Sequence, residues 1–184
     1  MFKKSFSKVI IVQKKFNLLI SCPRFHERDA MAEVRYLYLN IGDEGVKTQL
    51  TPFPGLITAD TTLDPISSIH KLKEIISEDP TFLKFVLKIV PIEKVVETEL
   101  ENLIEIVKEF EKCISLNETF RITLKKRRSN LDTENLIFKI AAYIDRKVNL
   151  TTPNKIVMIQ ILGAITGLSL LTPEDLLSHA EFSL

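Results

Sequence analysis

The feature that most constrains the fold is the alternation of short apolar runs with amphipathic stretches in the first half of the chain. Residues 16–23, FNLLISCP, form a short apolar run ended by proline, which is typical of a buried strand. Residues 29–41 follow with helical spacing of their apolar positions, and Asp29 can cap this helix. Residues 46–61 predict two short strands, interrupted by PFPG because its prolines lack the backbone donor of a central strand.

A second helix and a fourth strand complete this half. Asp64 and Pro65 have the residue types of a helix cap and a first helical position, and the amphipathic segment after them ends before Pro80. Residues 82–91, FLKFVLKIVP, alternate apolar residues with lysines and predict a strand. The resulting βαββαβ order over 16–91 is the ferredoxin-like order.

The second half also alternates helices with strands. Thr98 and Glu101 have the spacing of a capping box, and a continuous apolar stripe predicts a helix over 98–114. A strand is predicted over 119–125, and Asp132 is expected to cap the next helix. The remaining segments are a loop at 147–154, strands at 155–162 and 166–171, and a short closing helix at 172–179.

These patterns predict an α+β chain with two small domains. We expect a basic N-terminal extension at 1–15, a ferredoxin-like domain at 16–92 and an α/β domain at 93–184. A chain of 184 residues with 45% hydrophobic content can bury cores of this size.

The formal net charge of +1 conceals a segregation of charge along the chain. Residues 1–15 carry five lysines and no acid, whereas 16–116 carry 11 basic and 17 acidic residues. Residues 117–155 are basic again, with nine basic and four acidic residues, and 156–184 carry three acids and no base. This distribution favours a polyanion-binding face on an otherwise acidic body.

Several kinds of site are disfavoured by the sequence. Five glycines and no glycine-rich phosphate loop argue against a nucleotide cofactor, and three isolated histidines argue against a metal site. Cys22, His26 and Asp29 lie close together, but we interpret them as the end of a strand and the turn before a helix rather than as a catalytic group. We expect no catalytic residue, no cofactor, no small-molecule substrate and no membrane span. The two distant cysteines favour a cytoplasmic protein.

The stretch TFRITLKKRRSN contains the most unusual charge in the chain. Continuing the strand would place Lys126 on the face of Phe120, where burial of its charge is costly, so we expect the strand to end there. The cations Lys125 to Arg128 would then lie in a loop before the helix capped by Asp132. Such a loop is suited to binding a phosphate backbone. The alternative is a solvated loop that keeps the strand end soluble.

The segment from 118 to 173 resembles a THUMP domain, the RNA-binding module of several tRNA-modifying enzymes. The resemblance covers the strand with its basic run, the following helix, KVNLTTPN, the apolar strand and TGLSLL. Residues 16–92, with FNLLISC and PFPG, are similar to the ferredoxin-like domain that precedes THUMP in such proteins. The positions that match the family are Lys125, Arg127, Lys147, Pro153 and Asn154. Asn149 and Asn154 stand where acids are usual.

The resemblance implies a non-catalytic adaptor, similar to the stand-alone THUMP protein of tRNA cytidine acetylation. Such an adaptor binds the acceptor stem and 3′ CCA end of tRNA and presents the tRNA to a cytidine N4-acetyltransferase or another modification enzyme in trans. The expected RNA-binding residues are Arg121, Lys125, Lys126, Arg127, Arg128, Lys139, Arg146, Lys147, Asn154 and Lys155.

Two other functions stay open from the sequence. The chain could be the RNA-binding subunit of a split methyltransferase or thiolation enzyme and contribute to its active site. It could also be a protein-interaction module in which the basic charge is incidental.

Overall fold

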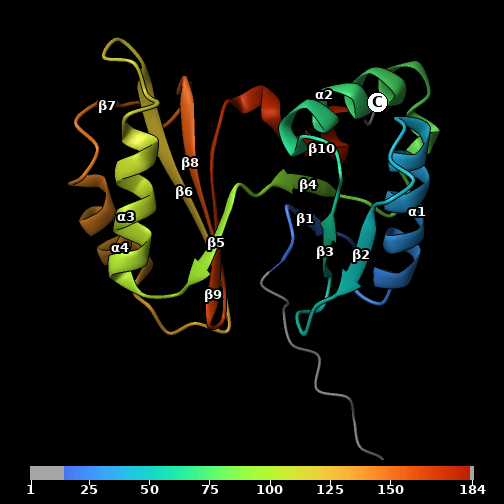
Figure 1. The fold of residues 1–184 in the computed structure, drawn as a ribbon, viewed down its shortest axis with the longest axis horizontal. Helices are drawn as coiled ribbons and strands as arrows, with labels where there is room; N and C mark the ends of the chain where they lie inside the picture. The colour runs from blue at the N-terminus through green and yellow to red at the C-terminus, as the bar shows by residue number, and fades with distance from the viewer. Residues whose placement is uncertain (1–14, 183–184) are drawn as a thin grey trace, which may run out of the picture.

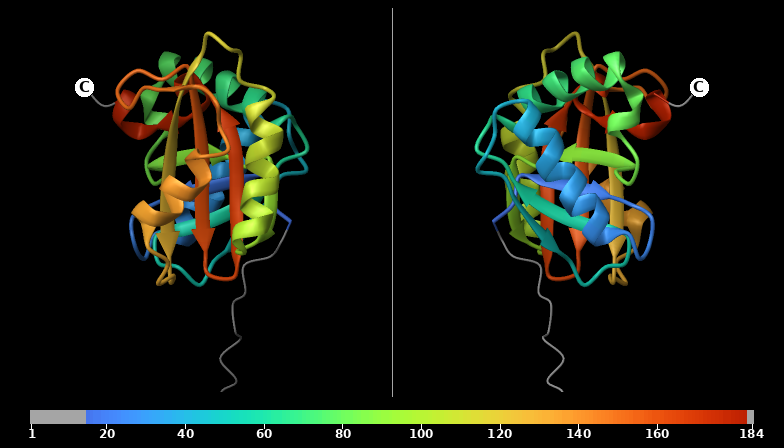
Figure 2. Two further views of the ribbon diagram at one scale, coloured as in Figure 1. Left: turned by 90° about the vertical axis from the view of Figure 1, so that its left-hand side faces the viewer. Right: turned by 90° about the vertical axis from the view of Figure 1, so that its right-hand side faces the viewer.

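The computed structural model describes residues 15–182, and these form four layers. Two helices cover the outer side of one sheet, two helices cover the outer side of a second sheet, and the inner faces of the two sheets meet in the middle (Figure 1). The strands of the second sheet run across those of the first (Figure 2). The expected α+β fold is therefore confirmed. The predicted N-terminal extension falls, except for Lys15, outside the described residues.

The first sheet contains the predicted βαββαβ unit. Its elements are β1 (Leu18–Ser21), α1 (Glu27–Asn40), β2 (Lys47–Leu50), β3 (Leu56–Asp60), α2 (Pro65–Glu78) and β4 (Lys88–Pro91). A further strand from the C-terminal segment, β10 (Leu177–Ser178), pairs with β4, and the antiparallel order is β10-β4-β1-β3-β2.

The second sheet is mixed and has the order β5-β9-β8-β6-β7. Its elements are β5 (Lys94–Glu97), α3 (Leu100–Glu111), β6 (Thr119–Arg127), α4 (Thr133–Ala141), β7 (Lys147–Val148), β8 (Lys155–Leu162) and β9 (Ile165–Leu171). Strand β6 is parallel to both of its neighbours, but β7 pairs only with Thr119 and Phe120. Most of β6 is therefore an edge of the sheet.

Three apolar layers hold these elements together. Leu18, Ile20 and Ile89 pack against α1 and α2, while Phe120 and Ile159 pack against α3 and α4. The third layer lies between the sheets and is composed mainly of Phe16, Leu19, Phe53, Leu56, Val90, Ile92, Ile156, Met158, Leu162, Ile165 and Leu171. Because these side chains come from both sheets, the two halves share one buried interface.

The two halves approach closely where β9 meets Ile92, which follows β4. A Cβ atom added to Gly167 would lie 3.0 Å from Cγ2 of Ile92 and 3.1 Å from its Cδ1. The missing side chain at Gly167 lets Ile92 pack directly on the backbone of β9.

The strand predicted over 82–91 is shorter than expected. Residues 80–82 form a 3₁₀ turn, η1 (Pro80–Phe82), and strand pairing begins only at Lys88. The carboxylate of Glu33 on α1 accepts hydrogen bonds from the backbone N–H groups of Lys84, Phe85 and Val86 at 2.8–3.1 Å. These amides are satisfied by a side chain rather than by a neighbouring strand.

Helix caps confirm two predictions and correct two others. The carboxylates of Asp64 and Asp132 accept backbone N–H bonds at the starts of α2 and α4, as expected. Helix α1 begins at Glu27, so Asp29 lies in its first turn and does not cap it. Thr98 does not form a capping box with Glu101. Its hydroxyl instead pairs with that of Thr166 at 2.9 Å.

The C-terminal segment returns to the first sheet. In place of the closing helix expected at 172–179, the chain forms η2 (Pro173–Asp175), β10 and η3 (His179–Glu181). Asp175 receives hydrogen bonds from His70 of α2 and from the backbone of Thr172. The division near residue 92 stays a prediction, and the segment from 172 to 182 lies with the first half in space.

Candidate nucleic-acid interface

The sequence predicts that strand β6 ends at Lys126, but the strand continues through the basic run. It pairs with β8 up to Arg127, opposite Leu162. The prediction assumed that the helix-facing side stays buried, but burial falls along this face. Phe120 is buried, Ile122 and Leu124 are half-buried, and Lys126 is exposed. The Lys126 ammonium donates a hydrogen bond to the carbonyl of Leu131, so no buried charge arises. Only Arg128 lies in the loop.

The other face of β6 points toward the first sheet and is cationic. Arg121, Thr123, Lys125 and Arg127 alternate along this face. Their partners on β8 are Ile156, Met158, Gln160 and Leu162, which are all buried. On the inner face of the second sheet, the residues of β8 are buried and the neighbouring residues of β6 are mostly cationic. The two strands are about 4.8 Å apart.

The first sheet adds a lysine to this cationic face. Lys88 begins β4 and shares a face with Val90 of the inter-sheet layer. Burial and the positive charge of Lys125 lower the pKa of Lys88, with a smaller contribution from Arg121 and an opposing one from Glu181. Because Lys125 and Arg121 both act on Lys88, the three side chains lie in one region.

Arg128 continues this region around the end of β6. Its φ is 48°, in the left-handed region, and its guanidinium carbon lies 5.6 Å from the centroid of the Phe53 ring in the first half. We call Lys88, Arg121, Lys125, Arg127 and Arg128 the basic junction. From Arg121 to Arg127 it extends about 20 Å along β6.

Lys125 and Arg127 are the most available cations of the basic junction. Both are exposed, and neither side chain forms a hydrogen bond or ion pair within residues 15–182. The guanidinium of Arg128 lies over the Phe53 ring, and its N–H groups form no hydrogen bond within residues 15–182. Arg121 is less available, because its Nη1 donates to the carbonyl of Leu150 at 2.9 Å. Its Nε is buried and has no hydrogen-bond partner in the described part of the chain.

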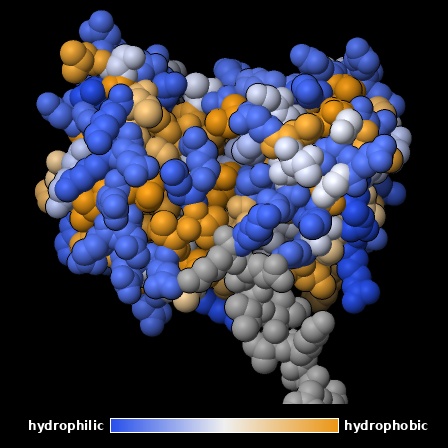
Figure 3. Space-filling model, in the orientation of Figure 1, coloured by the Kyte–Doolittle hydropathy of each residue, from blue (hydrophilic) through white to orange (hydrophobic). Residues whose placement is uncertain are grey.

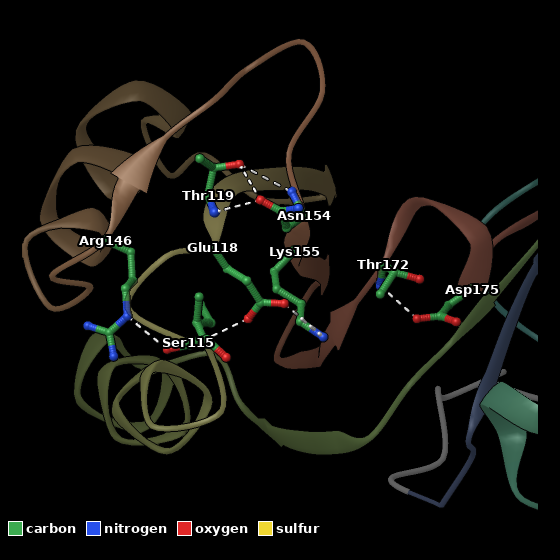
Figure 4. Close-up of polar contacts among 9 residues, drawn as sticks. Ser115, Glu118, Thr119, Arg146, Asn154, Lys155, Thr172 and Asp175 are labelled. Atoms are coloured by element: carbon green, nitrogen blue, oxygen red, sulfur yellow. Dashed lines mark hydrogen bonds and ion pairs between the residues drawn. The ribbon is translucent and has the colours of Figure 1, made fainter.

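Three of the other predicted RNA-binding residues lie at the opposite end of β6 and have structural roles (Figure 4). The Arg146 side chain is only 11% exposed, and its guanidinium binds the carbonyl of Ile114 and the carboxylate of Glu111. Lys155 pairs with Glu118 at 3.9 Å. Asn154 accepts hydrogen bonds from the backbone N–H and the hydroxyl of Thr119, each at 2.9 Å.

The loop at 147–154 is held by two asparagines. The Asn149 side-chain oxygen accepts the N–H groups of Thr151 and Thr152, and its amide donates to the carbonyl and hydroxyl of Thr152. An aspartate could accept the first two bonds but could not donate the others. Asn154 likewise acts as an acceptor. The loop is therefore anchored without an acid at either position.

Lys139 and Lys147 complete the predicted set. Both are exposed, and neither side chain forms a hydrogen bond or ion pair within residues 15–182. Lys139 lies in the last turn of α4, and Lys147 begins β7. The structure thus gathers Arg121, Lys125, Arg127 and Arg128 into the basic junction. It places the other predicted residues elsewhere, apart from Lys126, which lies on the opposite face of the same strand end.

The sequence patterns did not identify Lys88 as a site residue. The alternation of residues 82–91 places it on one face of a strand, but sequence does not reveal that this face meets a second sheet. Its approach to Lys125 and Arg121 depends on tertiary packing alone.

The opposite edge of the second sheet has a different character. The face shown in Figure 3 contains α3 and β5, with hydrophobic residues visible between the two halves. Glu93, Glu97 and Glu99 lie in or beside β5, and burial raises the pKa of Glu93, whose carboxylate accepts the N–H of Leu170. An acidic edge of this kind is unsuited to phosphate, so the β6 side is the candidate interface.

Cys22, His26 and Asp29 do not form a reactive group. The Cys22 side chain is buried, and this burial, with the nearby charge of Glu27, raises the pKa of its thiol to about 11. His26 binds Asp29 at 2.9 Å and stacks on Phe85. Within residues 15–182 we find no group of three or more His, Cys, Asp or Glu side chains that could hold a metal ion. No helix in that range is long and apolar enough to span a bilayer.

One protein-family model matches the part of the chain that contains β6. The family model described as the THUMP domain matches residues 97–171, from the end of β5 to the end of β9. No curated protein matches the chain.

Solved structures share the fold over most of the chain. PH1313 from Pyrococcus horikoshii Ot3 is similar over 89% of this chain and 55% of its own, with a TM-score of 0.64 and 14% identity. TrmN from Thermus thermophilus is similar over 83% and 44%, with a TM-score of 0.54 and 12% identity. A 4-thiouridine synthetase, solved with RNA and bound ATP, is similar over 89% and 42%, with a TM-score of 0.52 and 12% identity. The chain spans about half of each of these proteins.

Proposed function

We propose that this protein, whose residues 97–171 form a THUMP domain, is a non-catalytic adaptor that binds tRNA and presents it to a modification enzyme. The observation that carries the proposal is the basic junction, where Lys125 and Arg127 are exposed and unpaired within residues 15–182 beside the half-buried Lys88. In an isolated protein, such like charges repel one another. A phosphate backbone laid along β6 offsets that repulsion.

The chemistry of the junction fits phosphates better than bases. Arginine can bind a phosphate through two parallel N–H bonds, and lysine supplies a point charge. Such contacts position an RNA without reading its sequence. A bound phosphate also favours the charged form of Lys88, which burial and Lys125 disfavour in the free protein.

The proposed ligand region is the acceptor stem and 3′ CCA end of tRNA. Two observations support this choice. The resemblance to THUMP proteins extends through the basic run, and a protein of similar fold, the 4-thiouridine synthetase, was solved in complex with RNA. We propose that the partner in trans is a cytidine N4-acetyltransferase, on the basis of the resemblance to the stand-alone adaptor.

The direct test is a Lys125→Ala/Arg127→Ala double variant. We expect its affinity for tRNA to fall by about 10- to 100-fold, because two charge-assisted contacts are lost. The slope of log affinity against log salt should become shallower by roughly 1.4–1.8. The measurement is fluorescence anisotropy with labelled tRNA over a range of salt concentrations.

A matched control removes two other exposed cations, with Lys47→Ala/Lys71→Ala. Lys47 lies on the far edge strand β2 and Lys71 on the outer helix α2. This variant changes net charge equally and should bind like the parent. Equal losses in the two variants would show that affinity follows net charge, and unchanged binding in the junction variant would show that its cations only protect an exposed strand edge.

A second candidate function is favoured by the fold similarity to TrmN and the 4-thiouridine synthetase. The chain could be the RNA-binding subunit of a split modification enzyme and contribute to its active site. Single-turnover rates at saturating tRNA separate the two functions. An adaptor changes the tRNA concentration needed by the partner, whereas an active-site subunit changes the rate at saturation. A protein-interaction module would leave tRNA binding absent in both assays.

A further inference from the structure

Phe25 is the most exposed large hydrophobic residue in the described chain, with 93% of its surface accessible. Its φ is 72°, in the left-handed region that favours glycine. Phe25 and Arg128 are the two non-glycine residues with positive φ among residues 15–182. An aromatic side chain held in a strained turn and directed into solvent contributes no packing to the fold, so its position calls for another explanation.

The turn that presents Phe25 is firmly anchored. The N–H of His26 donates to the carbonyl of Pro23, which places Phe25 third in a four-residue turn where positive φ is typical. On one side, the N–H of Cys22 bonds to the carbonyl of Gly55. On the other, the Glu27 carboxylate accepts the N–H of Gly55 at 2.7 Å. The ring is thus displayed from a fixed backbone.

This turn lies next to the basic junction. A Cβ atom on Gly55 would lie 3.7 Å from Arg24 Cγ, so the turn touches the loop that contains PFPG. The same loop contributes Phe53, whose ring contacts the guanidinium of Arg128. Figure 2 shows the turn after β1, in dark blue, beside the lower end of β6, in yellow, in both views.

The charges around Phe25 favour an anionic partner. Arg24 and Arg28 are exposed, and neither side chain has a hydrogen bond or ion pair to the described residues. The two nearby acids are occupied by protein donors: Glu27 binds the N–H of Gly55, and Asp29 binds His26. An exposed ring with free arginines beside it matches the combination that binds single-stranded nucleic acid, where bases stack on aromatic faces and cations follow the backbone.

We infer that Phe25 is a stacking platform for an unpaired nucleobase of the RNA whose phosphates lie on the basic junction. The inference rests on the proposed RNA-binding function. It adds a specificity that the phosphate contacts lack, because a base within a duplex is already stacked and cannot lie on the ring. An RNA with an unpaired 3′ end is therefore preferred over the same duplex with a blunt end.

The test compares two RNA duplexes that differ only in unpaired 3′-terminal nucleotides, one of which is a fluorescent adenine analogue. The parent protein should bind the RNA with the unpaired end more tightly and should quench the analogue. Phe25→Ala should weaken binding to that RNA by about 5- to 100-fold and abolish the quenching, with binding to the blunt duplex unchanged. Phe25→Trp should retain both properties.

Phe138→Ala is the matched control, because Phe138 is 78% exposed on α4 and belongs to no part of this site. If the parent binds the blunt duplex, and Phe25→Ala binds both RNAs with the affinity of the parent, the inference is overturned and the proposed function stays in place. Equal losses by Phe25→Ala on both RNAs would also overturn it. If the parent binds neither RNA, the proposed function fails and the inference fails with it.

Discussion

At the scale of single residues, Lys88 shows how a side chain can disfavour the free protein and favour its complex. The ammonium is half-buried at the start of β4, and Lys125 and Arg121 repel it. Glu181 attracts it and only partly offsets these effects. The same side chain that raises the energy of the free protein is one that we propose contacts a phosphate.

Replacing Lys88 should therefore separate stability from binding. In the folded protein, the pKa of Lys88 is lowered, so the cost of its charge is fully present at pH values below that pKa. As pH rises through the folded pKa, the folded state releases the proton before the unfolded state does, and the free energy of unfolding of the parent increases. Lys88→Met should be more stable than the parent at neutral pH by about 0.5 kcal/mol, a small value because water screens the group.

Urea unfolding of both proteins at neutral and alkaline pH measures this effect. The difference between Lys88→Met and the parent should shrink as pH rises, and tRNA affinity should be lower in the variant. A variant that is less stable at neutral pH would mean that the contact with Glu181 outweighs the burial and repulsion.

Residue-scale prediction from sequence picked out the basic run but not its conformation. Lys125 and Arg127 were expected in a loop, because Lys126 was expected to end the strand, whereas both lie on one face of β6. Lys88 and Phe25 could not be found from the sequence. The place of Lys88 in the basic junction depends on a contact between the two sheets. The role proposed for Phe25 depends on its positive φ and its exposed side chain, which a sequence does not display.

At the scale of elements, strand β6 and the loop at 147–154 form one unit. Asn154 connects the start of β8 to Thr119 at the start of β6, and Arg121 of β6 reaches the carbonyl of Leu150 in the loop. The loop therefore fixes the end of β6 that is opposite the basic run. The ladder with β8 sets the direction of β6, whereas the attachment of the loop to the start of β6 depends on these few side-chain hydrogen bonds.

Two substitutions at Asn154 test that dependence. Asn154→Ala removes the acceptor for both the N–H and the hydroxyl of Thr119, and we expect a loss of about 1 kcal/mol in the free energy of unfolding. Asn154→Asp keeps the acceptor and should stay within about 0.5 kcal/mol of the parent. Urea unfolding gives both values. Equal destabilisation by the two variants would show that the amide of Asn154, rather than its oxygen, matters.

Element boundaries departed from the sequence predictions where side chains replace backbone partners. The segment from 83 to 87 alternates like a strand, yet Glu33 from a distant helix binds three of its amides. Thr98 has capping-box spacing but pairs with Thr166 across the sheet. Both departures come from long-range contacts that local pattern cannot anticipate.

At the scale of the whole molecule, the layer between the sheets determines how the basic junction is assembled. Met158 is 2% exposed in this layer and is the β8 partner of Thr123, between Arg121 and Lys125. Cations from β6 and from β4 meet only because the two sheets pack across one another. The βαββαβ order was predictable from periodicity, but this crossed packing and the return of β10 were not, because neither has a local signal.

The shared layer predicts that both sheets unfold together. Met158→Ala should lower the free energy of unfolding by about 2–4 kcal/mol, through lost burial and the cavity left behind. Amide hydrogen exchange, followed separately for β1 and β8, should show the same loss of protection in both strands. A loss confined to β8 would show that the two halves unfold independently.

The pairing of β10 with β4 also limits which fragments of this protein represent the whole chain. The match to the THUMP family ends at Leu171, but the chain continues into β10, which is hydrogen-bonded to β4 of the first sheet. A fragment limited to residues 97–171 would expose Ile156, Met158 and Leu171 to water and would lack Lys88. An isolated THUMP fragment would thus have an exposed apolar surface and an incomplete basic junction. RNA-binding measurements on this fragment would therefore describe a different surface from that of the whole chain.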